Sequence, residues 1–156
     1  PNRFYEIERP RKQTSLPKVL NKKEIATMIV VTQNLKHKCI ISLLYSAGLR
    51  RSELLNLKLT DINSEKHTLR IENSKGSKDR ISIISPNLII ELRTYWKQYR
   101  TKKYLFEGEN GKQYSAGSVL KIVKNAAKKA TYLAPYLSNN TPALATKNEL
   151  INVPII

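Results

Sequence analysis

Apolar residues recur at the spacing of an α-helix in several segments of the chain. In the first segment, Asn21 followed by Glu24 is the pattern of a capping box, in which each side chain accepts a hydrogen bond from the other residue's amide. A second apolar segment, "LKHKCIISLLYSA", runs directly into Gly48, a residue that commonly ends helices. Three further segments carry the same periodicity, and the second of them begins with a proline typical of a helix start. The pattern predicts helices within residues 15–34, 35–47, 50–57, 86–100 and 115–130.

A different period, with apolar residues at every second position, appears in the middle of the chain. Leu69 and Ile71 alternate with polar residues, and so do Ile81 and Ile83, on either side of the small polar turn 73–77. This pattern is typical of a β-hairpin. Residues 104–106 are interpreted as a short strand. The expected fold class is α+β, mostly helical, with one small antiparallel sheet.

The net charge of +16, from 28 basic and 12 acidic residues among 156, favours a polyanionic partner. A merely lysine-rich protein is the alternative, but the basic residues lie within segments predicted to fold. No apolar run is long enough to cross a membrane, and no secretory signal is present. A single cysteine, Cys39, excludes an internal disulfide and a cysteine-rich zinc site, and it is expected to be a buried thiol in a cytoplasmic protein.

Changes in composition divide the chain into three parts. Residues 1–15 are basic, contain prolines and lack periodicity, so they are interpreted as a linker from an upstream domain. Residues 16–130 form the predicted domain. Residues 131–156 hold only two charged residues and no glycine, and we expect a tail of uncertain fold.

The segment "YSAGLRRSELLNLKLTDI" raises the first question of chemistry, because it places arginines beside a predicted core. Arg50 begins a short helix, and Glu53 lies three residues later, within reach of its guanidinium or of the helix's first amides. Lys75 lies in the turn of the hairpin. If Arg50 and Lys75 converge, they form a clamp for one phosphate. The alternative is that both are solvated surface residues, and spacing by itself favours that alternative.

Three motifs in order, "SAGLRRSELLNLKLTDI", "SKGSKDR" and "YLFEGENGKQYSAGSVLKIVKNAAKKA", resemble the catalytic domain of tyrosine recombinases of the phage-integrase and Xer type. The resemblance covers roughly residues 16–130. It implies that Arg50 is the first catalytic arginine and that Glu53 is the acidic residue that supports it. It also implies that Lys75 is the general acid for the 5′-hydroxyl leaving group.

The resemblance further implies double-stranded DNA as the partner, other recombinase subunits as possible partners, and chemistry that uses no metal or cofactor. Arg51, Lys78 and Arg80 match no catalytic position of the family and are expected to contact the DNA backbone or water.

The resemblance stops after Ala130. The family continues with a His-x-x-Arg box, a second histidine or tryptophan, and a nucleophilic tyrosine, but residues 131–156 contain neither histidine nor arginine. His67 and Arg70 have the spacing of the box, yet they lie on a predicted strand before the hairpin turn. Tyr132 and Tyr136 lie too early to be the nucleophile. We therefore expect the C-terminal helices of the domain to be missing, through a frameshift or truncation after about residue 130.

Three functions remain in competition. The chain is a DNA breaking-and-rejoining recombinase that is incomplete and inactive by itself, or a non-catalytic protein that binds duplex DNA. A third reading, a basic RNA- or ribosome-associated protein, rests on charge alone, since no RNA-binding module appears.

Overall fold

The computed structural model describes residues 19–74 and 78–139. In these ranges the helices are α1 (Lys22–Val31), α2 (Leu35–Ser46), α3 (Arg51–Asn56), α4 (Pro86–Tyr99) and α5 (Ala116–Asn139), with 3₁₀ turns at Leu59–Asp61 and Glu109–Gly111. The strands are β1 (Ile62–Asn63), β2 (Thr68–Ser74) and β3 (Lys78–Ile83). The mostly helical α+β fold class is confirmed. The sheet has three antiparallel strands in the order β1-β2-β3, one more than the predicted hairpin.

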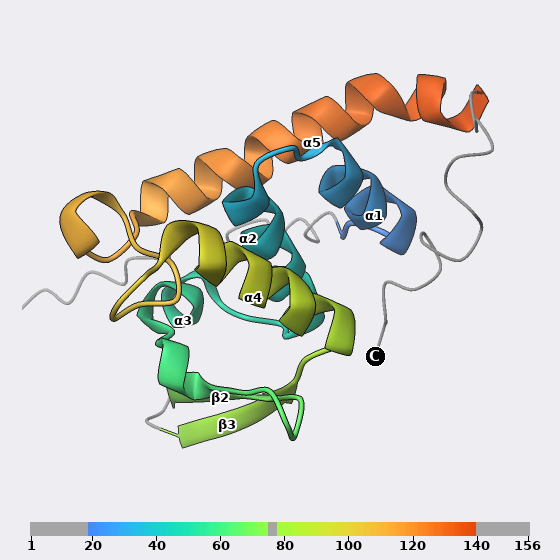
Figure 1. The fold of residues 1–156 in the computed structure, drawn as a ribbon. Helices are drawn as coiled ribbons and strands as arrows, with labels where there is room; N and C mark the ends of the chain where they lie inside the picture. Colours follow the sequence, from blue (N-terminus) through green and yellow to red (C-terminus); the bar gives the residue numbers. More distant parts are fainter. Residues whose placement is uncertain (1–18, 75–77, 140–156) are drawn as a thin grey trace, which may run out of the picture.

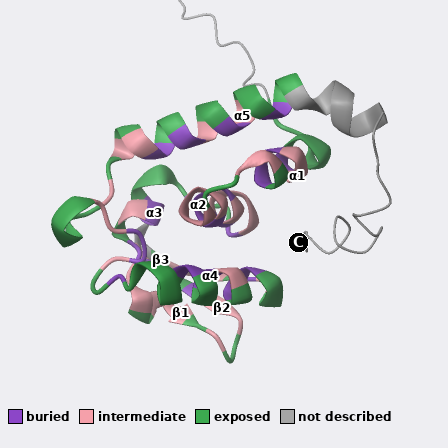
Figure 2. Cartoon of the chain, turned by 45° about the horizontal axis from the view of Figure 1, so that its top comes forward, coloured by how far each residue is buried: buried purple, intermediate pink, exposed green. Residues whose placement is uncertain are grey.

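The elements form layers, with α5 on one side of the molecule and the sheet on the other (Figure 1). Helix α5 lies along α1, and α2 and α4 pack against each other in the middle. Helix α3 contacts both α5 and β2, so it joins the two sides. Figure 2 shows the buried faces of α1, α2, α4 and α5 turned toward one another. The core therefore lies between the helices, and the sheet covers one end of it.

Local sequence signals set the ends of the helices. The capping box at α1 is present: the Glu24 amide donates to Asn21 Oδ1 at 2.9 Å, and the Asn21 amide donates to Glu24 Oε2 at 2.7 Å. Helix α4 begins at Pro86, and Ser85 caps it by accepting a hydrogen bond from the Leu88 amide. Helix α2 ends before Gly48, whose φ of +56° lies in the left-handed region that glycine adopts without strain.

Apolar side chains from every helix and from the sheet fill the core. Tyr95 is its largest fully buried side chain, with ring centroids 4.8 Å from Tyr99 and 5.3 Å from Phe106. Cys39 is fully buried, as predicted, and burial raises the pKa of its thiol to about 12. Other fully buried members come from α1, α2, α3, β2, the residue after β3 and the segment around residue 105, namely Met28, Ile40, Leu43, Leu54, Leu69, Ile71, Ile84 and Leu105.

The sheet shows which strand faces point inward. Leu69 and Ile71 face the core, and they pair with Ser82 and Arg80 on β3. Ile81 and Ile83 lie on the opposite face and are 73% and 56% exposed. The alternating pattern therefore predicted the strand, but its apolar positions lie outside, and the inner face of β3 carries a serine and an arginine instead.

Three details differ from the sequence prediction. On α4, Tyr95 is buried, whereas Trp96, which shares the helical spacing of the buried Leu88 and Leu92, is 39% exposed. Residues 104–106 form no strand, and only the single bridge between Lys58 and Tyr104 pairs there. Helix α5 passes residue 130 and continues to Asn139, so the change in composition at residue 131 does not end the helix.

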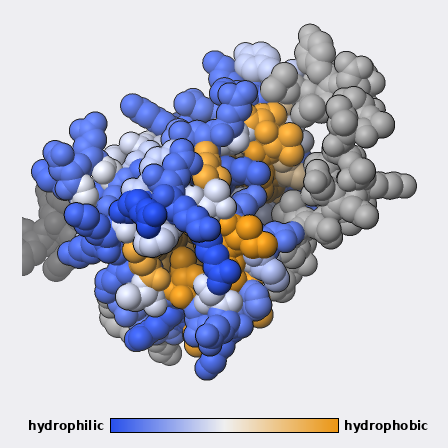
Figure 3. Space-filling view, viewed as in Figure 1, coloured by the Kyte–Doolittle hydropathy of each residue, from blue (hydrophilic) through white to orange (hydrophobic). Residues whose placement is uncertain are grey.

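The visible surface is mainly hydrophilic, with scattered apolar patches (Figure 3). Within the described ranges, none of the helices is both long enough and apolar enough to cross a membrane.

Candidate functional site

The corner between α2 and α3 carries the first predicted site residue. After the left-handed turn at Gly48, Leu49 is buried and Arg50 stands at the N-cap of α3 in extended conformation. The Arg50 side chain is 57% exposed, and its Nη1 donates to Glu53 Oε1 at 2.9 Å. The main chain is therefore fixed by the core on one side, while the guanidinium stays accessible to a ligand.

Glu53 is a buried charge, with only 3% of its side chain exposed. Its Oε2 accepts hydrogen bonds from the Arg50 amide at 2.8 Å and from Arg80 Nη2 at 2.8 Å. Burial by itself raises the pKa of Glu53, but hydrogen bonds from the Arg50 amide and from the Arg80 and Arg50 guanidinium groups outweigh it and lower the pKa to about 2. Glu53 is thus an ionised anchor held by three donors.

Arg80 belongs to the same cluster, which the sequence did not predict. From the inner face of β3, its Nη2 donates to Glu53 and also to the Gly48 carbonyl oxygen at 2.9 Å. Two positions along, Ser82 Oγ donates to the Ala47 carbonyl oxygen at 3.1 Å. Strand β3 is therefore fastened to the α2–α3 corner at two points. Locating Arg80 from the sequence would have required knowing which face of β3 lies inside, and the alternating pattern by itself does not show this.

The remaining predicted site residues are placed only in part. Lys75 lies outside the described residues. Lys78 begins β3, where its backbone pairs with Ser74, and its side chain lies outside the description. Arg51 is exposed at the first position of α3. The structure therefore joins Arg50 and Glu53 to Arg80, and the roles predicted for Lys75, Lys78 and Arg51 stay predictions.

The alternative His-x-x-Arg pair is not assembled as a site. His67 has a φ of +52° at the turn before β2, and its carbonyl oxygen accepts from the Ile84 amide at 2.8 Å. Arg70 lies on the outer face of the sheet, where its Nη2 pairs with Asp79 at 3.0 Å. Both residues serve the hairpin, as expected from their place on a strand.

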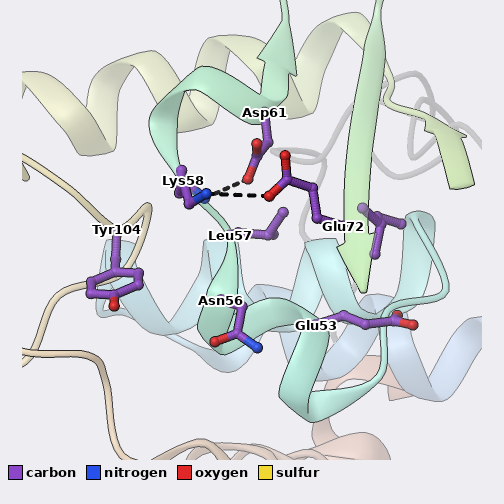
Figure 4. A pocket seen from close by; sticks show the side chains of 8 residues that line it. Glu53, Asn56, Leu57, Lys58, Asp61, Glu72 and Tyr104 are labelled. Atoms are coloured by element: carbon purple, nitrogen blue, oxygen red, sulfur yellow. Dashed lines mark hydrogen bonds and ion pairs between the residues drawn. The ribbon is translucent and has the colours of Figure 1, made fainter. Parts of the chain in front are cut away.

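A pocket of about 230 Å³ lies beside the cluster, between α3 and the sheet (Figure 4). The Lys58 amide donates to Asp61 Oδ2 at 2.7 Å, and Lys58 Nζ donates to Glu72 Oε2 at 3.2 Å. In Figure 4 the Glu53 carboxylate points away from Lys58. The pocket holds three carboxylates and one lysine, Lys58, which is already paired with Glu72, so the pocket is not suited to an anion.

A larger groove, of about 550 Å³, runs between α5 and the start of α2. Its basic residues are Lys121, Lys128 and Lys129 on α5, with His37 opposite. Burial and the nearby charges of Lys36 and Lys129 lower the pKa of His37, so this histidine is neutral at pH 7. Asn34 and Asn125 add hydrogen-bonding groups. A groove of lysines and amides is suited to a phosphate backbone.

Among residues 19–74 and 78–139, histidines, cysteines and carboxylates form no group of three or more that could hold a metal ion.

The family model described as the phage integrase family matches residues 18–140. The chain belongs to this family. The match includes the Gly48 corner, the hairpin and α5, so the arginine–glutamate cluster lies inside the matched range.

Two relatives show how far this similarity extends. The chain is 41% identical over 127 residues to the tyrosine recombinase XerA of Pyrococcus horikoshii, which covers 79% of this chain and 45% of that protein. It is 42% identical over 100 residues to a putative integrase/recombinase, y4qK, of Sinorhizobium fredii, covering 64% of this chain and 32% of that one. The chain therefore spans less than half the length of these relatives.

Solved structures agree on the fold. A XerA recombinase structure superposes with a TM-score of 0.67 at 24% identity, covering 78% of this chain and 45% of that chain. XerH bound to its palindromic difH substrate gives 0.64 at 21% identity, covering 75% and 37%. The lambda integrase catalytic core gives 0.55 at 18% identity, covering 72% of each chain. At these identities the comparison establishes the architecture of the domain.

Proposed function

We propose that this chain is part of a site-specific DNA recombinase or integrase, which breaks and rejoins duplex DNA through a phosphotyrosine intermediate. The observation that carries the proposal is the position of Arg50, whose exposed guanidinium is aimed from a rigid corner and held by a buried carboxylate. A forked donor fixed in this way suits the charge that develops on a phosphate during phosphoryl transfer. Relatives named as recombinases support the same role.

Duplex DNA is the proposed partner, and the basic groove beside α5 is its proposed second contact. Lys121 and Lys128 lie seven residues apart, about two turns, so both are on one side of the helix. XerH and lambda integrase are relatives in fold that were solved with DNA bound. By analogy, α5 and the Gly48 corner would share one duplex, with contacts from α5 supplying attraction and Arg50 supplying alignment of one phosphate.

We infer further that residues 131–156 do not supply the family's second catalytic box, since they contain no histidine or arginine. In a covalent mechanism, loss of the nucleophile removes the reaction rather than slowing it. The missing second arginine would add about 3 kcal/mol to the barrier, the typical effect of one lost oxyanion donor.

The frameshift hypothesis can be tested on the coding DNA. All three reading frames beyond the Ala130 codon should be translated after resequencing. A frame that encodes His-x-x-Arg followed by a late tyrosine would support a shifted recombinase. Absence of such a frame would contradict the frameshift and leave the DNA-binding function as the reading to pursue.

The second candidate function, a non-catalytic DNA-binding protein, is favoured by the same groove, and one experiment separates the two. The full chain is incubated with end-labelled duplex DNA, and samples are resolved both natively and after denaturation in SDS. A complex that survives SDS is a covalent protein–DNA adduct and indicates catalysis. A native complex without an adduct indicates binding alone, and absence of both contradicts a role on DNA.

The contribution of Arg50 is measured in the same binding assay. We expect Arg50→Ala to weaken duplex binding by about tenfold, the equivalent of one charge-assisted contact. Lys102→Ala is the matched control, because Lys102 is exposed and its amide, rather than its side chain, donates to Glu107. Equal losses for the two variants would show that only nonspecific attraction operates.

A further inference from the structure

Arg80 is the residue through which the hairpin contacts the Gly48 corner. Its backbone pairs with Ile71 of β2, which places the side chain on the inner face of the sheet. From there one guanidinium nitrogen, Nη2, donates to both the Gly48 carbonyl oxygen and Glu53 Oε2. These contacts join residues 32 and 27 positions apart in the sequence. Arg80 therefore connects strand β3 to the α2–α3 corner, which lie far apart in the sequence.

The charges of the cluster show why a second arginine is needed. Glu53 carries one negative charge, and Arg50 by itself would only neutralise it. With Arg80 also bound, the cluster of two guanidinium groups and one carboxylate has a net charge of +1. The side chain of Arg80 is 36% exposed against 57% for Arg50, so the outer arginine is the one better placed to meet an anion.

Removing Arg80 would act on Arg50 indirectly. Glu53 Oε2 would keep only the Arg50 amide as a donor, and a carboxylate this buried is destabilised by each lost donor. The Gly48 carbonyl would also lose its partner at the turn that leads into Arg50. Both effects would loosen the corner that aims the Arg50 guanidinium.

We propose that Arg80 is a positioning residue for Arg50: it holds Glu53 and the Gly48 turn so that the Arg50 guanidinium stays aligned for a DNA phosphate. This role rests on the proposed function, and it replaces direct contact with the DNA backbone as the reading of Arg80. It also makes strand β3 part of the site, since the hairpin and the arginine corner are held in one geometry.

A double-mutant cycle on the full chain tests the proposal. Binding of a fluorescein-labelled duplex of mixed sequence is followed by anisotropy for wild type, Arg50→Ala, Arg80→Gln and the double variant. A positioning role predicts that Arg80→Gln weakens binding by up to about tenfold in the wild-type background and by less than about twofold once Arg50 is alanine. If the double variant instead weakened binding by the product of the two single-variant factors, Arg80 would bind DNA itself, and this would overturn the proposal.

The salt dependence of the same complexes gives a second criterion. A residue that contacts phosphate directly contributes about 0.9 to the slope of log K against log salt. In the Arg50→Ala background, we expect Arg80→Gln to leave that slope unchanged. A further decrease of about 0.9 would again identify a direct phosphate contact.

A spectroscopic measurement keeps the proposal testable if wild type binds no duplex, an outcome that contradicts the proposed function alone. Carbon-labelled glutamate reports the titration of Glu53, assigned by comparison with Glu53→Gln, and the Arg50 Nε–H resonance reports how firmly its guanidinium is held. We expect Arg80→Gln to raise the titration midpoint of Glu53 and to shift the Arg50 resonance toward that of free arginine. No change in either signal would overturn the proposal.

Two variants serve as controls. Arg70→Gln removes an arginine from the outer face of the same hairpin, where it pairs with Asp79, and should leave both resonances unchanged. Arg80→Lys retains a cation that can donate to both oxygens, and it should restore the Arg50 signal and bring binding within about threefold of wild type. Circular dichroism establishes that each variant is folded before it is compared.

Discussion

Replacing Glu53 with glutamine tests the energetics of the cluster most directly. The side chain is 3% exposed and accepts from three donors, and folding lowers the pKa from 4.5 to about 2. At 1.36 kcal/mol per pH unit, this difference corresponds to about 3 kcal/mol of stability at pH 7. Glutamine has nearly the same shape but no charge, and its amide NH₂ would face the hydrogen-bond donors of Arg50 and Arg80. We therefore expect Glu53→Gln to lower the free energy of unfolding by about 3 kcal/mol.

The direction of the pKa shift determines how this stability difference changes with pH. Because folding lowers the pKa of Glu53, its contribution is complete above about pH 4.5 and is lost as the pH falls from there toward 2. The difference between wild type and Glu53→Gln should therefore shrink on acidification, to about 1.4 kcal/mol at pH 3. Glu107 also has a lowered pKa, because hydrogen bonds from the amides of residues 102–104 outweigh its burial, but it is present in both proteins and cancels in the difference.

Urea denaturation followed by circular dichroism, repeated between pH 7 and pH 3, measures this difference. Glu91→Gln is the matched control, since Glu91 pairs with Lys38 at 3.3 Å but is 33% exposed, and its loss should be below about 1 kcal/mol. A difference for Glu53→Gln that is no larger than that of the control, or that stays constant with pH, would refute the assignment of Glu53 as an ionised anchor.

Two further substitutions test the corner and the core. Gly48→Ala should destabilise the protein by about 1 kcal/mol through backbone strain alone, because φ is +56° and a Cβ there would meet no atom of the described residues within 4 Å. A shifted urea midpoint at unchanged slope is the expected result, and no shift would contradict it. Tyr95→Phe should leave stability equal or raise it by up to about 1 kcal/mol, since no described residue bonds the buried Tyr95 hydroxyl; a clear loss in thermal denaturation would show that the hydroxyl has a partner.

The sequence was sufficient wherever the signal was local. The α1 capping box, the stop at Gly48 and the start of α4 at Pro86 each depend on residues within one turn, and all three were predicted correctly. The pairing of Arg50 with Glu53 was also predictable, because three residues separate them on one helix.

The role of Arg80 was not predictable, for a physical reason. In "DRISII" the apolar residues at 81 and 83 suggest one inner face, while Arg80, Ser82 and Ile84 form the other. Tertiary contacts select the second face, because Arg80 and Ser82 satisfy carbonyl oxygens of the α2–α3 corner and Arg80 also neutralises Glu53. A period-two pattern cannot show which face meets a buried acceptor. The extent of α5 was also missed, since the few charges and the lack of glycine after residue 130 argued for a change of structure there, whereas the helix continues to Asn139.

The arrangement of Arg50 also separates two electrostatic effects that the net charge of +16 combines. In the proposed complex, exposed lysines on α5 would attract DNA from a distance, and salt would screen that attraction over about 10 Å at 0.1 M. The Arg50 contact is short-ranged and anchored by a buried carboxylate, so screening reduces it less. We therefore expect the ratio of duplex affinities between wild type and Arg50→Ala to fall less per charge removed, between 50 and 200 mM salt, than the ratio for a triple change at Lys121, Lys128 and Lys129. If the two ratios fell equally per charge removed, Arg50 would be one more solvated cation, and the corner would have no special role in aligning phosphate.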